Sequence, residues 1–160
     1  VDITPRPAAK GVSRILEFMA AKADEGFVDL EEAADAIAEY QPHRPRPKDL
    51  SGLAKNLRLS EDGRWRWHWD PAFLSVRTGA SSEHARDRHH EELVTIARRI
   101  TMPTMLVRGR LSDLVTQDEV DEFLKMVPHA RYVDVKDAAH MIAGDKNDVF
   151  TDAVAAFLQG

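Results

Sequence analysis

The order of apolar and amphipathic segments between residues 101 and 160 constrains the fold of this chain more than any other feature. The run 103–108 is short, continuous and apolar, which is typical of a β-strand buried on both faces. Thr116 and Glu119 have capping-box spacing and open an amphipathic helix. A second strand over 131–135 and a closing helix over 149–158 follow. This order predicts a parallel strand pair with a right-handed crossover, and therefore an α/β fold class.

Two polar loops follow these strands directly. The first, 109–113, presents Asp113, and the second, 137–140, presents His140. In a doubly wound sheet, catalytic groups gather beyond the carboxyl ends of the strands. A carboxylate that accepts a hydrogen bond from one ring nitrogen fixes the histidine tautomer, and the other nitrogen can then act as a general base. Asp113 and His140 are therefore candidate catalytic residues.

Asp113 could instead have a structural role, and Asp118 is another candidate for the catalytic acid. An aspartate in such a loop commonly bonds its own backbone, which would make Asp113 structural. Asp118 is the nearest other carboxylate, but it lies in the first turn of a helix, where its charge suits the helix dipole. The order of acid and histidine along the chain favours Asp113 as the catalytic acid.

The first part of the chain predicts helices with a proline-rich interruption. Apolar residues at three- and four-residue steps predict a helix over 11–24. Asp29 and Glu32 form a capping box that opens a second helix, which ends near Tyr40. The three prolines of segment 41–48 predict an extended connection there, and its basic residues are interpreted as a solvated loop.

A short helix over 50–57 precedes a candidate hairpin. The Asp62-Gly63 pair predicts a two-residue turn between a strand ending at Leu59 and a strand over 64–69. A polar helix follows, and it can bury only its later apolar stripe between Leu93 and Ile100.

Three tryptophans alternate along the second hairpin strand and so share one face of the ribbon. They are Trp65, Trp67 and Trp69. These side chains are candidate substrate-binding residues that line a pocket, or they pack this segment against the rest of the protein. Because buried aromatic residues mostly belong to a core, packing is the favoured interpretation.

His84, His89 and His90 raise the question of a metal site. Spacings of five and six residues do not place all three on one helix face. We therefore interpret them as part of a solvated helix face and expect no metal.

Composition excludes several classes of function. The formal charge of −5 comes from 27 acidic and 22 basic residues that are mixed along the chain, so no basic face is predicted and nucleic acid is not an expected partner. The chain has no cysteine, which excludes disulfides and cysteine nucleophiles and fits a reducing compartment. No apolar run is long enough to span a bilayer, and no leader opens the chain, so we expect a cytoplasmic protein without membrane partners.

Residues 103–113, the pair Ala139-His140 and the terminal helix together resemble the end of an α/β-hydrolase. The opening residues 1–5 look like the end of that family's sixth strand, after which the epoxide-hydrolase and cofactor-free haloperoxidase-like branch inserts a helical cap. Residues 6–100 would be this cap, with a short hairpin and a return helix, and 101–160 the last two strand-helix units. The resemblance implies a C-terminal fragment with a mainly helical cap.

The resemblance also implies roles for residues. Asp113 would be the triad acid and His140 the general base of a hydrolase that acts on a small apolar ester, epoxide or related substrate without a cofactor. Ala139 stands where the family usually has glycine. The serine or aspartate nucleophile elbow, such as G-x-S-x-G, occurs nowhere in the 160 residues, and 79–83 follows no predicted strand. We therefore expect the nucleophile upstream of Val1 and no activity from this chain alone.

Two further expectations follow from the resemblance. An open sheet edge would pair with the missing N-terminal half or with a second copy. Peroxidative chemistry through a peracid is an open alternative to ester hydrolysis. A function from another class is also possible, namely a non-enzymatic module that binds a ligand or partner and carries a vestigial triad.

Overall fold

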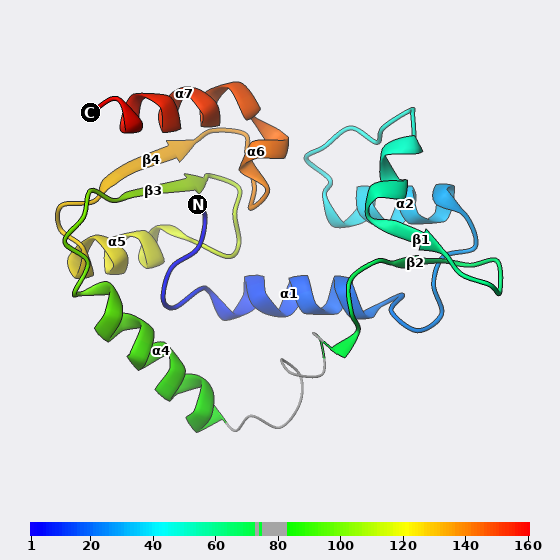
Figure 1. Cartoon of the computed structure of the whole chain (residues 1–160), viewed down its shortest axis with the longest axis horizontal. Helices are drawn as coiled ribbons and strands as arrows, with labels where there is room; N and C mark the ends of the chain where they lie inside the picture. The colour runs from blue at the N-terminus through cyan, green and yellow to red at the C-terminus, as the bar shows by residue number, and fades with distance from the viewer. Residues whose placement is uncertain (73, 75–82) are drawn as a thin grey trace. The chain divides into compact units, whose positions relative to one another are not determined.

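The computed structural model describes residues 1–72, 74 and 83–160, and these divide into two compact units (Figure 1). The first unit joins Val1–Ser13 to Ser82–Gly160, and the second is Arg14–Ser81. The second unit lies within the range 6–100 that was expected to form the cap. The exact cap boundaries stay a prediction.

The first unit is built on two parallel strands, β3 (Met105–Gly109) and β4 (Arg131–Val135). Met105 pairs with Arg131 at one end of the ladder, and Gly109 pairs with Val135 at the other. Helix α5 (Gln117–Met126) connects the strands, and α7 (Asn147–Leu158) follows them on the opposite side of the pair (Figure 1). The predicted order of strand, helix, parallel strand and helix is confirmed.

Strand β3 is buried on both faces, as its apolar run predicted, whereas β4 is mostly half-buried and only its last residue, Val135, is fully buried. Leu106 packs into one cluster with residues of α5 and of α4 (Glu83–Ala97). Val107 and Val135 pack into a second cluster with Ala138 and with Ile142 of a short helix, α6 (Ile142–Asp145). The strands thus form the middle layer between helices, which places their carboxyl ends, and the loops that follow, at one edge of the unit.

Helix α5 begins where the capping box predicted. The Thr116 side chain accepts from the backbone of the helix, and Glu119 accepts from the Thr116 N–H at 2.8 Å. This reciprocal pair satisfies N–H groups that have no partner within the helix. The start of α5 is therefore fixed, and it anchors the far end of the loop that follows β3.

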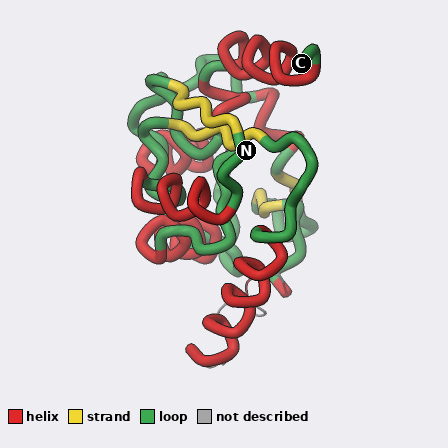
Figure 2. The backbone as a smooth tube through the Cα atoms, turned by 90° about the vertical axis from the view of Figure 1, so that its left-hand side faces the viewer, coloured by secondary structure: helices red, strands yellow, loops and turns green. Residues whose placement is uncertain are grey.

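The N-terminal residues lie beside β3, and the N-terminus is seen near the strand ends in Figure 2. They form no assigned strand, but the Asp2 N–H donates to the Val107 carbonyl at 2.7 Å. Asp2 has a φ of 47°, in the left-handed region that non-glycine residues rarely occupy. Asp2 is thus hydrogen-bonded to β3 near its carboxyl end, but its backbone does not have the conformation of a strand.

The second unit contains helices and a small antiparallel ribbon. Helix α1 (Ala9–Ala20) runs into it. Helix α2 (Leu30–Tyr40) has Asp29 as its N-cap, and the Asp29 side chain accepts from the Glu32 N–H as predicted, whereas the Glu32 carboxylate accepts from the Val28 N–H and does not complete a capping box. The segment 41–48 contains no helix, in agreement with its prolines. The short helix expected over 50–57 is a 3₁₀ turn, η1 (Ser51–Lys55).

The hairpin exists, but its predicted turn is wrong. Strand β1 (Leu57–Leu59) pairs with β2 (Trp65–Trp67). Ser60 N–H donates to Arg64 O, and Gly63 N–H donates to Ser60 O, so three residues form the loop and Gly63 has a φ of +80°. This is a turn followed by a left-handed glycine, in which Gly63 takes the bulge position instead of the second central position.

None of the helices among the described residues combines the length and apolar character that crossing a bilayer requires.

Candidate active site

Asp2 is the centre of the polar site at the carboxyl end of β3. Its side chain is fully buried. Oδ1 accepts from the Gly109 N–H at 3.0 Å, and Oδ2 accepts from the Ser112 hydroxyl at 2.6 Å. Oδ2 also lies 2.9 Å from Nδ1 of His140. An ionised carboxylate only accepts hydrogen bonds, so three donors converge on a group that can take them all.

His140 lies in the loop after β4, where the sequence placed it, and it is half-buried. The hydrogen bond that the ring donates to Asp2 raises the pKa of His140, partial burial opposes this, and the charges of Asp2 and Asp113 raise the pKa further. With Nδ1 directed to a carboxylate, the tautomer that carries its proton on Nδ1 is favoured. Nε2 is then the nitrogen that can accept a proton.

Asp113 lies in the predicted loop and is half-buried. Its charge contributes to the raised pKa of His140, but less than the hydrogen bond and charge of Asp2 do. The structure therefore brings two carboxylates to bear on one imidazole. The assignment of Asp113 as the catalytic acid stays a prediction, because the hydrogen bond to Nδ1 is made by Asp2.

The sequence motifs do not single out Asp2. The resemblance makes residues 1–5 the end of a core strand, and a carboxylate at such a strand end is the signal that marks Asp2 as a candidate. Asp2 and His140 are separated by 138 residues. Their contact depends on Asp2 lying next to β3.

Backbone hydrogen bonds hold the two polar loops against each other. Arg110 N–H donates to Val135 O at 2.9 Å, and Leu111 N–H donates to Ala138 O at 2.8 Å. On the other side, Ala139 N–H donates to the Asp145 carboxylate at 2.8 Å. The backbone that leads to His140 is therefore held by hydrogen bonds that involve neither Asp2 nor the imidazole ring.

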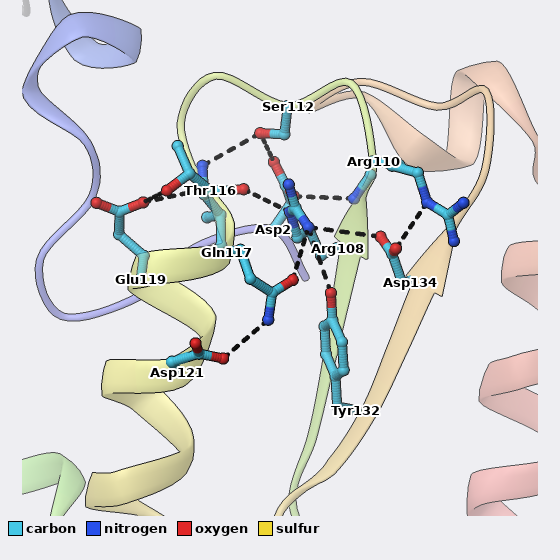
Figure 3. A network of polar contacts seen from close by, with 12 residues as sticks. Asp2, Arg108, Arg110, Ser112, Thr116, Gln117, Glu119, Asp121, Tyr132 and Asp134 are labelled. Carbon is cyan, nitrogen blue, oxygen red and sulfur yellow. Dashed lines mark hydrogen bonds and ion pairs between the residues drawn. The ribbon is translucent and has the colours of Figure 1, made fainter.

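A buried arginine braces the strand ends from within the unit (Figure 3). Arg108 Nε donates to the Val115 carbonyl at 2.7 Å, and Nη1 lies 3.3 Å from the Gln117 side chain. Nη1 is also 3.8 Å from the Asp134 carboxylate, which pairs with Arg110 as well. Since Arg108 is on β3 and Asp134 on β4, this network ties the loop after β3 to both strands.

Gly109 leaves no room for a side chain where the two loops meet. A Cβ at this position would lie 2.2 Å from the Ala139 carbonyl oxygen and 2.6 Å from that of Ala138. Both obstacles are backbone atoms of the histidine loop, which cannot move without displacing His140. Glycine is required here for close approach of two backbones.

Replacement of Gly109 by alanine is expected to lower the free energy of unfolding by about 2 kcal/mol, because overpacking forces the backbone to shift. Urea denaturation of this chain measures the loss. Gly52→Ala is the matched control, since nothing lies within 4 Å of the Cβ it would add, and it should change stability by less than about 0.5 kcal/mol. Equal stability of the two variants would contradict the close approach at Gly109.

The three tryptophans belong to the second unit, whereas His140 belongs to the first. Trp65 and Trp67 pack against the cluster of Phe27, Ala33 and Leu57, and the Trp67 ring makes an edge contact with the Phe27 ring at 5.4 Å. Trp69 is half-buried. These contacts favour packing for Trp65 and Trp67, and a role in substrate binding stays a prediction.

The candidate histidine group lies on α4. The ring centroids of His89 and His90 are 6.5 Å apart, and the side chain of His84 lies outside the described part of the chain. Within that part, no three histidine, aspartate or glutamate side chains are grouped as a metal ion would require.

The fold is that of the C-terminal part of an α/β-hydrolase. The structure superposes on E-2-(acetamidomethylene)succinate hydrolase with a TM-score of 0.78 and 20% identity, covering 100% of this chain and 56% of that one. An esterase from Mycobacterium tuberculosis gives a TM-score of 0.69 and 25% identity, again over 100% of this chain and 50% of the esterase.

One curated relative is 3-hydroxybutyrate-oligomer hydrolase of Cupriavidus necator, 25% identical over 144 residues. The match covers 87% of this chain and 48% of the relative, so the chain spans about half the length of the proteins it resembles. No protein-family model matches the chain.

Proposed function

We propose that this chain supplies the histidine and acid of a hydrolase that cleaves small carboxylic esters. The contact between the buried Asp2 carboxylate and Nδ1 of His140 carries the proposal, because it lies at the carboxyl ends of parallel strands in an α/β-hydrolase fold. An oriented imidazole next to a buried carboxylate is the arrangement that activates a hydroxyl nucleophile. The hydrolases among the structural neighbours and the curated relative support this class.

In the proposed reaction, Nε2 of His140 takes the proton of the attacking hydroxyl and returns it to the leaving alcohol. A second cycle activates water to release the acid product. Asp2 accepts the Nδ1–H bond throughout and stabilises the imidazolium form. Asp113 adds a weaker, longer-range charge on the same ring.

The nucleophile is proposed to come from residues outside these 160. The sequence contains no G-x-S-x-G elbow. Ser112, which contacts the dyad, donates its hydroxyl proton to Asp2, so it is not free to attack a substrate. We therefore expect no turnover from the 160 residues alone, and we propose that they pair with the half that carries the nucleophile.

The nucleophile also separates substrate classes. A serine supports ester hydrolysis, as the named esterase and oligomer hydrolase suggest, whereas an aspartate supports the epoxide-hydrolase branch that the sequence resembles. Peroxidative chemistry and a cytoplasmic location stay proposals as well. The alternative is a non-catalytic binding module with a vestigial triad, which neither the contacts of the described residues nor the named relatives specifically favour.

The test is an assay of the protein encoded by the complete reading frame. It should hydrolyse p-nitrophenyl esters of short acids and, among natural ester linkages, 3-hydroxybutyrate oligomers. A panel of epoxides and haloalkanes serves as comparison. Turnover of epoxides with no ester hydrolysis would replace the proposed substrate class, and no turnover of any member would favour the binding module.

A further inference from the structure

Ser112 is a buried residue of the site that takes no part in the proposed hydrolysis. Its side chain is buried, and its Oγ lies 2.6 Å from Oδ2 of Asp2, the same oxygen that lies 2.9 Å from Nδ1 of His140. The serine and the histidine therefore share a single carboxylate oxygen. Figure 3 shows Ser112 and Asp2 at this point, at the top of β3.

The direction of the serine hydrogen bond follows from its other partners. Oγ accepts from the Leu114 N–H and from the Val115 N–H, each at 3.2 Å. A hydroxyl has one proton and two acceptor lone pairs. Because two backbone donors occupy the acceptor side, the only proton of Ser112 is left for Asp2.

The loop that carries Ser112 is held at both ends. Ser112 N–H donates to Gly109 O at 2.9 Å, which closes a turn directly after β3. Arg108 holds the Val115 carbonyl at 2.7 Å, so the peptide that follows the two amide donors is fixed from within the unit. The position of the Ser112 hydroxyl is thus set by the strand and by the arginine, independently of His140.

We propose that Ser112 is a positioning residue that weakens the hold of Asp2 on the protonated form of His140. A hydroxyl that donates to Oδ2 withdraws negative charge from the oxygen on which the imidazolium depends. His140 therefore releases its proton more readily than it would beside a carboxylate without this donor. The inference rests on the proposed function, because it gives His140 the role of the base.

The charged groups that act on His140 among the described residues are Asp2, by contact, and Asp113, by its charge. Asp145 accepts from the backbone of the neighbouring Ala139 and holds the loop rather than the ring. The single hydroxyl proton of Ser112 is donated to the first of these groups, Asp2. Removal of the Ser112 hydroxyl should therefore change the influence of Asp2 and leave that of Asp113 in place.

The experiment compares Ser112→Ala and Ser112→Thr with the unchanged chain. The titration of His140 is followed by ¹H–¹⁵N NMR of the imidazole ring, with the other histidines as internal references. Ser112→Ala is expected to move the midpoint of His140 upward by about half a pH unit. Ser112→Thr keeps the hydroxyl and should return the midpoint to its original value.

Two outcomes in Ser112→Ala would overturn the proposal. An unchanged midpoint would mean that the serine only braces the loop. A lowered midpoint would mean that the serine holds Asp2 in contact with the ring. If the alanine variant does not fold, Ser112→Cys takes its place, because a thiol is a weaker donor of similar size. The His140 midpoint in Ser112→Cys should then rise by less than about half a pH unit. The NMR result does not need a nucleophile. A shifted midpoint in this chain, combined with no ester hydrolysis by the protein encoded by the complete reading frame, would refute the proposed function and leave the inference standing.

Discussion

Replacing Asp2 by asparagine is expected to lower kcat for ester hydrolysis by about 10⁴-fold in the protein that carries the nucleophile. An amide in this position has nearly the same shape but can present its NH₂ group to Nδ1, which favours the wrong tautomer of His140. The Gly109 and Ser112 donors would also face an acceptor of lower charge. Steady-state kinetics with a p-nitrophenyl ester measures the effect.

Asp113→Asn is the matched control for this variant. Asp113 acts on His140 as a charge, and its contribution is smaller than that of Asp2. Its replacement should cost less than about tenfold in kcat, which corresponds to about 1.4 kcal/mol. The reverse order of the two effects would return the role of the acid to Asp113, as the sequence motif predicts.

His140→Ala is expected to lower kcat by about 10⁵- to 10⁶-fold, because the general base and the general acid of both half-reactions are lost together. The remaining rate would come from substrate binding and from whatever groups stabilise the developing oxyanion. KM should change little, since the imidazole acts on the reacting atoms. A direct assay over hours of incubation is needed to reach so low a rate.

A control for folding belongs with this variant. His129 lies in the loop before β4, where its ring contacts the Met102 carbonyl at 3.0 Å, and it is exposed. His129→Ala should retain full activity. Substantial turnover by His140→Ala, with normal folding, would remove the histidine from the mechanism and leave the vestigial triad as the better account.

Prediction from sequence succeeded where the signal is local. The strand pair, the N-cap at Asp29, the capping box at Thr116 and the loop position of His140 follow from local sequence patterns, and the structure confirms them. At Asp29 the box is incomplete, because the Glu32 carboxylate accepts from the Val28 N–H. The short helix α6 was not predicted, since four residues give too little periodicity to detect. The hairpin turn failed because Asp-Gly is compatible with both a two-residue turn and a three-residue loop.

The identity of the catalytic acid is the feature that the sequence predicts least well. Asp113 stands in a motif with a familiar order, so sequence favours it, whereas Asp2 lies far from any motif and in a left-handed conformation that spacing does not reveal. Its link to His140 requires that Asp2 lie beside β3 and that Gly109 allow the two loops to meet. Both conditions depend on tertiary structure, which residue spacing does not predict. The contact between Ser112 and Asp2 depends on the same packing and could not be predicted from the sequence either.

The most direct test of the pairing between Asp2 and His140 is the NMR titration of His140 in the unchanged chain and in Asp2→Asn. In the unchanged chain the midpoint should lie above 6.5, because the Asp2 carboxylate stabilises the imidazolium, so the ring stays protonated to higher pH than a free histidine. In Asp2→Asn the midpoint should fall, since burial of the ring remains while its hydrogen-bonded charge is lost. A midpoint that is unchanged by Asp2→Asn but falls in Asp113→Asn would contradict the account and identify Asp113 as the acid.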